Sequence, residues 1–178
     1  LTYAVSLLPK TNQVIQWTNS FIERETTPIS ASSSGTFYRG DYNKLDVNNV
    51  VNINQNQSLL MGVDIENEQG ATTYSSQTSQ SSVGGYAQYH WINPVLSTQL
   101  SARYEENSNY SSDPIQTYNV SMFRNIPLIN VQATGTLKTG FRVPTLYEES
   151  NKSADLAPET SKTYEVSLAK TIQQAVVK

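Results

Sequence analysis

The chain of 178 residues has a formal net charge of −3 and no cysteine, so its composition excludes a basic field for nucleic acid and excludes disulfide or thiolate chemistry. Only 37% of its residues are hydrophobic and only 15% are charged, whereas a soluble globular domain usually has about 25% charged residues. Serine, threonine, asparagine, glutamine and 11 tyrosines make up the balance, a composition typical of β-structure.

Alternation of apolar and polar residues predicts strands along nearly the whole chain. No run of about 18 apolar residues occurs, which excludes helical membrane spans. We predict about nine strands, at Thr2–Leu8, Gln13–Arg24, Phe37–Ile53, Ser58–Glu66, Val83–Ile92, Leu96–Glu106, Ile115–Arg124, Leu128–Phe141 and Ser161–Lys170.

The connections between these strands are predicted to alternate between short and long. The short ones lie at Pro9–Asn12, Asn54–Gln57, Asn93–Pro94 and Asn125–Pro127, and the long polar ones at Thr26–Thr36, Asn67–Ser82, Asn107–Pro114 and after Arg142. Short periplasmic turns and long extracellular loops are typical of transmembrane β-barrels, whose strands need about 9–11 residues to cross. We therefore predict an all-β fold, an antiparallel transmembrane β-barrel segment. The alternative is a soluble or surface-displayed β-domain that acts as a binding or adhesion module.

One segment carries a recognisable motif. A strand ends at Arg142-Val143-Pro144, because proline has no N–H for a sheet ladder, and a strand pattern resumes at Ser161. The pattern G-F-R-x-P-T-L-x-E, followed by L-x-P-E-T-S-x-x-Y-E-x-x-L, resembles a late barrel segment of TonB-dependent outer-membrane receptors. The matching residues are Gly140, Phe141, Arg142, Pro144, Thr145 and Leu146 at the strand exit, and Leu156, Pro158, Glu159, Ser161, Tyr164 and Glu165 at the re-entry.

This resemblance implies a receptor or transporter segment, not an enzyme, in the outer membrane of a Gram-negative bacterium. Its implied partners are outer-membrane lipid, a scarce nutrient such as a ferric siderophore or cobalamin, the receptor's own plug domain and, through the plug, TonB. Residues 1–178 then form one barrel segment, without the plug and the closing strands, because family barrels have 22 strands. The resemblance also implies that Glu165 faces the plug; the simpler interpretation of Glu165 is a solvated glutamate in the barrel lumen.

Other candidate site residues follow from residue type. Tyr38, Tyr74, Tyr110 and Tyr147 lie at predicted loops, where tyrosines contact a ligand or form an interfacial girdle. No metal or other cofactor is required, although Asp64, Glu66 and Glu105 are weak calcium candidates that lack the spacing of a calcium-binding loop. The single histidine, His90, has no accompanying nucleophile and acid in the sequence, which argues against hydrolase chemistry.

Overall fold

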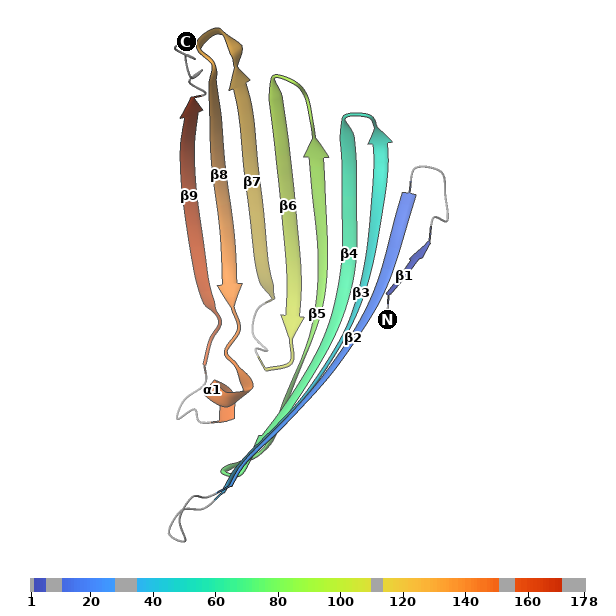
Figure 1. Cartoon of the computed structure of the whole chain (residues 1–178), viewed down its shortest axis with the longest axis vertical. Coiled ribbons are helices and arrows are strands. Elements are labelled where there is room, and N and C mark those ends of the chain that lie inside the picture. The colour runs from blue at the N-terminus through green and yellow to red at the C-terminus, as the bar shows by residue number, and fades with distance from the viewer. Residues whose placement is uncertain (1, 6–10, 28–34, 110–113, 151–155, 171–178) are drawn as a thin grey trace, which may run out of the picture.

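The computed structural model describes residues 2–5, 11–27, 35–109, 114–150 and 156–170. These residues form a nine-stranded antiparallel sheet in which the strands pair in chain order (Figure 1). The all-β antiparallel prediction is therefore confirmed, and the sheet does not close on itself. The strands are β1 (Thr2–Val5), β2 (Thr11–Thr26), β3 (Thr36–Asn54), β4 (Gln57–Thr72), β5 (Ser75–Trp91), β6 (Leu96–Asn107), β7 (Ile115–Ile126), β8 (Val131–Arg142) and β9 (Glu159–Lys170).

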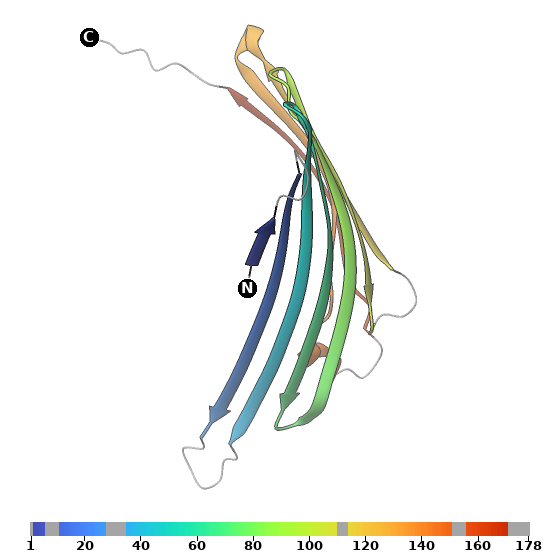
Figure 2. The ribbon, with the colours of Figure 1, turned by 90° about the vertical axis from the view of Figure 1, so that its right-hand side faces the viewer.

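The register of the strands separates an apolar face from a polar face. Residues directly opposite each other on neighbouring strands share a face. One such row is apolar and runs through Val51, Leu59, Tyr89, Leu100, Val120, Leu137 and Tyr164. The row one residue away along β5 to β9 is polar and runs through Gln88, Ser101, Asn119, Lys138 and Thr163. The sheet is curved, as Figure 2 shows.

The distribution of burial is the reverse of that in a soluble protein. Among the described residues no hydrophobic side chain is buried, whereas Asp64 and Glu105 retain only 1% and 6% of their accessible surface. On the apolar face, Val63 and Leu100 are 53% and 42% exposed. A water-soluble β-protein buries its apolar face against a second layer, and the described part of the chain supplies no such layer.

The apolar face ends abruptly within β2 to β5. The row Trp17, Leu45, Ile65 and Val83 is followed by Asn19, Asn43, Asn67 and Ser81 on the same face. The Asn19 amide donates to the Asn43 side-chain oxygen at 2.7 Å, so this polar row is tied across two strands. Beyond it the four strands continue with mostly polar residues on both faces and extend past β6 to β9 at the lower edge of Figure 1.

This extension corrects the prediction of a long loop at Asn67–Ser82. These residues belong to β4 and β5, which are joined by a turn at Thr73–Tyr74. The sequence shows no apolar alternation there because neither face of the extension is apolar, and the two strands are paired by backbone hydrogen bonds and by polar side-chain contacts such as Gln77 with Gln69. The prediction that short and long connections strictly alternate is therefore wrong at the β4–β5 hairpin.

The remaining differences concern the ends of the elements. Leu128 lies in a 3-10 helix, η1 (Pro127–Ile129), instead of a strand; it is 95% exposed, and Asn130 in a left-handed conformation leads into β8. Thr11 and Asn12 belong to β2 instead of a turn, and most of the predicted loop Thr26–Thr36 lies outside the described residues. The structure adds one short helix, α1 (Leu146–Ser150), that the sequence did not predict.

No helix in the described ranges is long and apolar enough to cross a membrane.

Candidate functional site

The motif segment folds into a compact turn at the end of β8. Thr145 and Glu148 form a reciprocal cap of α1: the Thr145 backbone N–H donates to the Glu148 carboxylate at 2.7 Å, and the Glu148 N–H donates to the Thr145 hydroxyl at 3.3 Å. This is the capping box expected for T-x-x-E. Arg142 donates to both Glu148 oxygens at 2.7 and 3.0 Å and reaches Glu159 of β9 at 3.4 Å. The motif thus joins the strand exit, the helix and the strand re-entry.

The other motif residues occupy the ladder between β8 and β9 or its edge. Gly140 lies opposite Ser161, whose hydroxyl is 3.5 Å from the Gly140 carbonyl, and Phe141 lies opposite Thr160. Tyr164 lies opposite Leu137 on the apolar face. Pro144 is buried beside α1, whereas Leu156 and Pro158 lie where the chain returns to β9. These positions suit a structural role for the motif at the strand exit and re-entry.

The capping box should make the α1 segment sensitive to acid. The Arg142 guanidinium, followed by the Thr145 bonds, lowers the pKa of Glu148 from its ordinary 4.5 to about 2. Since the folded-state pKa lies below the unfolded one, Glu148 stabilises the segment fully above about pH 4.5, and this contribution is lost as the pH falls toward 2. Hydrogen exchange of the Glu149 amide, corrected for intrinsic rates, should show protection at pH 5.5 that weakens at pH 2.5. A Glu148→Gln variant should lose this pH dependence, and an unchanged dependence in that variant would refute the assignment to Glu148.

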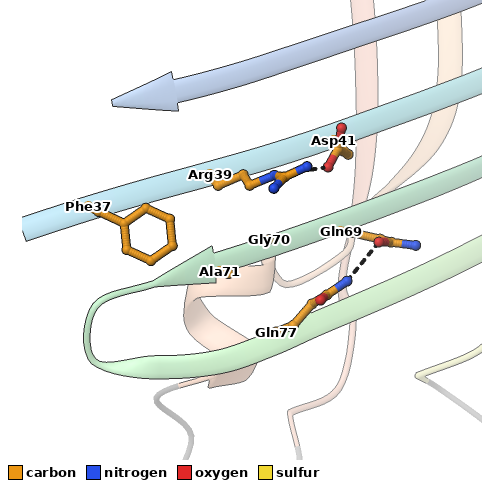
Figure 3. A pocket seen from close by; sticks show the side chains of 7 residues that line it. All are labelled: Phe37, Arg39, Asp41, Gln69, Gly70, Ala71 and Gln77. Atoms are coloured by element: carbon orange, nitrogen blue, oxygen red, sulfur yellow. Dashed lines mark hydrogen bonds and ion pairs between the residues drawn. The ribbon is translucent and has the colours of Figure 1, made fainter. Parts of the chain in front are cut away.

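The α1 segment packs against the polar face of the β4–β5 hairpin. The side chain of Leu146 lies against Gly70 of β4, where a β-carbon would be only 3.2 Å from Leu146 Cδ1. Val143 lines a hollow together with Glu66, Ser82 and Glu105 of β4 to β6. Figure 3 shows α1 behind the ribbons of β4 and β5. Residues 143–150 therefore cover part of the polar face.

A cavity of about 390 Å³ lies at this end of the sheet, where the end of β2, the start of β3, the β4–β5 turn and α1 meet. Its wall includes Arg24 of β2, Tyr38 of β3, Tyr74 of the β4–β5 turn and Tyr147 of α1. Three of the four tyrosines predicted from the sequence thus line one cavity, and Tyr110 lies outside the described residues. Tyr74 and Tyr147 are 76% and 69% exposed. We call this cavity, with Arg24, Tyr38, Tyr74 and Tyr147 in its wall, the tyrosine cavity.

The chemistry of the tyrosine cavity suits a ligand that has both rings and negative charge. Three phenol rings offer flat apolar surface and hydroxyl groups. Arg24 forms no ion pair with any residue in the described ranges. A guanidinium without a carboxylate partner at a cavity wall favours an anionic group on the ligand.

Deeper along the polar face, an arginine binds two buried carboxylates. Arg103 of β6 donates to both oxygens of Asp64 at 2.6 and 2.9 Å and to Glu105 at 2.9 and 2.5 Å. Its guanidinium also lies 5.7 Å from the centre of the Tyr86 ring. Gly84 provides the space, because a β-carbon there would be 2.4 Å from Arg103 Nη2. We call Asp64, Arg103 and Glu105 the arginine cluster.

The arginine cluster explains two of the three weak calcium candidates. Asp64 and Glu105 are bound by Arg103, and Glu66 lies 3.3 Å from Lys44. In the described part of the chain, no group of three or more His, Cys, Asp or Glu side chains is placed to hold a metal ion. The cluster itself was missed from the sequence, because Arg103 and Asp64 are 39 residues apart and only the strand register brings them together.

Two further sequence candidates lie away from the tyrosine cavity. Glu165 lies opposite Thr136 on the polar face, in the row that contains Ser121, Gln99 and His90. His90 contacts Gln88, two residues away on β5. Glu165 is exposed and belongs to the edge strand β9. The polar face of β9 around Glu165 is therefore not covered by any other described part of the chain.

A second hollow, of about 270 Å³, lies on the opposite face of the extension (Figure 3). Its polar groups satisfy one another: Arg39 lies 3.6 Å from Asp41, and the Gln77 amide donates to Gln69 at 2.8 Å. Arg39 also lies 5.1 Å from the centre of the Phe21 ring. Because Arg39 is already paired, this hollow selects an anion less well than the tyrosine cavity does.

This architecture matches a known protein family. The family model described as TonB dependent receptor-like, beta-barrel, matches residues 3–173. The chain belongs to this family. This match confirms the resemblance drawn from the motif. Members of the family are receptors and transporters of the Gram-negative outer membrane. Comparison with curated protein sequences finds no match.

Solved structures agree with the assignment to this receptor family. The copper transporter OprC has a TM-score of 0.70 at 10% identity, over 96% of this chain and 35% of OprC. The siderophore receptor PirA from Acinetobacter baumannii has a TM-score of 0.69 at 12% identity, over 93% of this chain and 30% of PirA. The RagAB peptide transporter has a TM-score of 0.52 at 10% identity, over 96% and 25%. At these identities the likeness shows the fold alone, and the chain spans 25% to 35% of these proteins.

Proposed function

We propose that this chain forms part of the barrel wall of an outer-membrane receptor that takes up a scarce nutrient. The observation that carries the proposal is the reversed burial: the apolar face is exposed, and in the described part of the chain Asp64 and Glu105 are more deeply buried than any large apolar side chain. Along β3 the apolar face runs from Ile53 to Leu45, with Asn49 as its single polar residue. This stretch is about 20 Å in height at a strand rise of about 3.4 Å and a tilt of about 40°. This height is comparable to the apolar band of about 25 Å in transmembrane barrels.

The tyrosine cavity is the proposed site of first contact with the nutrient. It lies beyond the polar asparagine row, at the end of the sheet where β2 to β5 extend farthest past the apolar band. We assign this end to the extracellular side because the longer connections of transmembrane barrels are extracellular. Its arginine and rings suit a ferric siderophore, cobalamin or a similar bulky solute with anionic groups. The similar structures are a copper transporter, a siderophore receptor and a peptide transporter, so this fold serves a range of cargoes. The motif and the arginine cluster then serve the barrel wall, and no covalent chemistry is required.

The polar face is proposed to meet a plug domain in the full receptor. Glu165 and its row offer a carboxylate and amide groups toward the lumen, where a plug residue of opposite charge satisfies the carboxylate. Energy reaches the ligand site from TonB through this plug, as is usual for the family. Calcium has no part in this proposal.

Substitutions in the tyrosine cavity test the ligand site. In the full receptor, Arg24→Ala and Tyr38→Ala should each weaken nutrient binding about tenfold, about 1.4 kcal/mol, because each removes a group from the cavity wall. The control is Arg39→Ala, which removes an arginine from the opposite face of the same extension. The measurement is uptake of radiolabelled iron by cells supplied with a panel of ferric siderophores, alongside uptake of labelled cobalamin. Equal effects of Arg24→Ala and Arg39→Ala on every substrate that is taken up would contradict this site.

A further inference from the structure

The wall of the tyrosine cavity is assembled from two distant parts of the chain. Arg24, Tyr38 and Tyr74 belong to the extended hairpins β2–β3 and β4–β5. Tyr147 comes from α1, between β8 and β9. An adjoining cavity of about 210 Å³ shows the same division, because its wall contains Thr78 of β5 as well as Leu146 and Tyr147. The cavity therefore exists in this form only while α1 lies against the hairpins.

Gly70 is the point of contact that allows this approach. A β-carbon at Gly70 would lie 3.2 Å from Leu146 Cδ1, which is closer than most real contacts of a β-carbon, and 3.8 Å from Leu146 Cβ, which is an ordinary contact. The Gly70 φ angle is not in the left-handed region, so backbone conformation does not require a glycine here. Glycine at this position instead leaves room for the Leu146 side chain, which a larger residue would displace.

The first turn of α1 is held by hydrogen bonds to its own capping residues. Glu148 is held by Arg142 and by both donor groups of Thr145. Pro144 and Glu149 are buried, although Tyr147 between them is largely exposed. Contact of Leu146 with Gly70 therefore holds the backbone of α1 where Tyr147 reaches the cavity wall.

We propose that Gly70 and Leu146 are positioning residues whose contact places Tyr147 in the ligand cavity, so that docking of α1 and ligand binding are coupled. The proposal rests on the proposed function of the tyrosine cavity. Since Tyr147 contacts the ligand only when α1 is docked, the ligand stabilises docking, and docking strengthens ligand binding by the same factor. An α1 that is displaced leaves a cavity open on one side.

The test is a double-mutant cycle in the full receptor. Gly70→Leu places a side chain where Leu146 lies, and Tyr147→Ala removes the ring that the contact positions. The matched control is Gly85→Leu, because a β-carbon at Gly85 meets nothing within 4 Å. The probe is the tris-catecholate complex of ferric iron, an anion with flat rings. Its affinity is measured by tryptophan fluorescence quenching.

We expect Gly70→Leu and Tyr147→Ala each to weaken probe binding about tenfold, and the double variant to be no weaker than either single variant. Gly85→Leu should bind as the wild type does. Additive losses, or normal binding by Gly70→Leu, would overturn the coupling.

A second readout needs no ligand and separates this inference from the proposed function. Hydrogen exchange of the Glu149 amide, which donates to the Thr145 carbonyl at 2.9 Å, should be at least about tenfold faster in Gly70→Leu than in Gly85→Leu. Equal exchange in the two variants would overturn the positioning role. If wild-type receptor does not bind the probe but the exchange rates differ as expected, the anionic ring-bearing ligand class fails while the positioning of α1 stands.

Discussion

Replacing Arg103 with methionine should destabilise the full receptor by about 3–5 kcal/mol. Asp64 and Glu105 are almost completely buried and both accept their hydrogen bonds from Arg103. Without the guanidinium, two carboxylates remain unpaired in a buried site, and breaking a buried ion pair from one side typically costs this much. The measurement is the free energy of unfolding in urea, with the receptor in phospholipid vesicles.

The matched control for this experiment is Arg39→Met. Arg39 pairs with Asp41, two residues away, just as Arg103 pairs with Glu105. The Arg39–Asp41 distance is 3.6 Å, however, and 56% of the Arg39 side chain is exposed. An exposed ion pair contributes at most about 1 kcal/mol. A triple variant, Arg103→Met with Asp64→Asn and Glu105→Gln, should recover part of the lost stability because it removes the buried charges. Equal costs for Arg103→Met and Arg39→Met would show that water or another domain already solvates the arginine cluster.

The second large effect is expected on the apolar face, at Leu100. This residue lies on the apolar face near the middle of β6, with Tyr89 and Val120 opposite it on the neighbouring strands. Leu100→Arg should cost about 2–4 kcal/mol because it places a guanidinium in hydrocarbon, whereas Ser101→Arg on the polar face should cost under about 1 kcal/mol. Both values come from unfolding of the full receptor in vesicles.

A third variant distinguishes lipid from a packed protein core. Leu100→Trp should be tolerated in a membrane because lipid yields around a larger apolar group. A close-packed core would instead be strained by about 1–3 kcal/mol. If Leu100→Arg and Leu100→Trp are both harmful, Leu100 faces protein and the lipid-facing assignment is wrong.

The sequence predicted the strands wherever one face is apolar and the other polar. In Leu96–Glu106, the alternation of Leu100 and Ser101 gave both the strand and its two faces, and the structure extends this strand by only one residue. The same reasoning failed at Asn67–Ser82, because β4 and β5 pass beyond the apolar row and lose the alternation. Strand pairing there depends on backbone hydrogen bonds, which leave no periodic signal in side-chain type.

The candidate site was predictable only in part, for a related reason. Tyr38, Tyr74 and Tyr147 were identifiable by residue type and by their places near predicted loops. That they share one cavity depends on α1, whose contact with Gly70 joins segments far apart in the chain. Arg103 and its carboxylates were likewise hidden until the register of β4, β5 and β6 was known.

The central claim, that the apolar face meets lipid and the polar face meets the lumen, is tested most directly with spin labels. The chain contains no cysteine, so labels are introduced at Val120→Cys and Ser121→Cys, adjacent positions on opposite faces of β7, in a receptor without other cysteines. In vesicles, the label at position 120 should be accessible to oxygen and shielded from a water-soluble nickel chelate. The label at position 121 should be less accessible to oxygen than its neighbour. High nickel-chelate accessibility at position 120, or oxygen accessibility that is equal at the two positions, would contradict the claim.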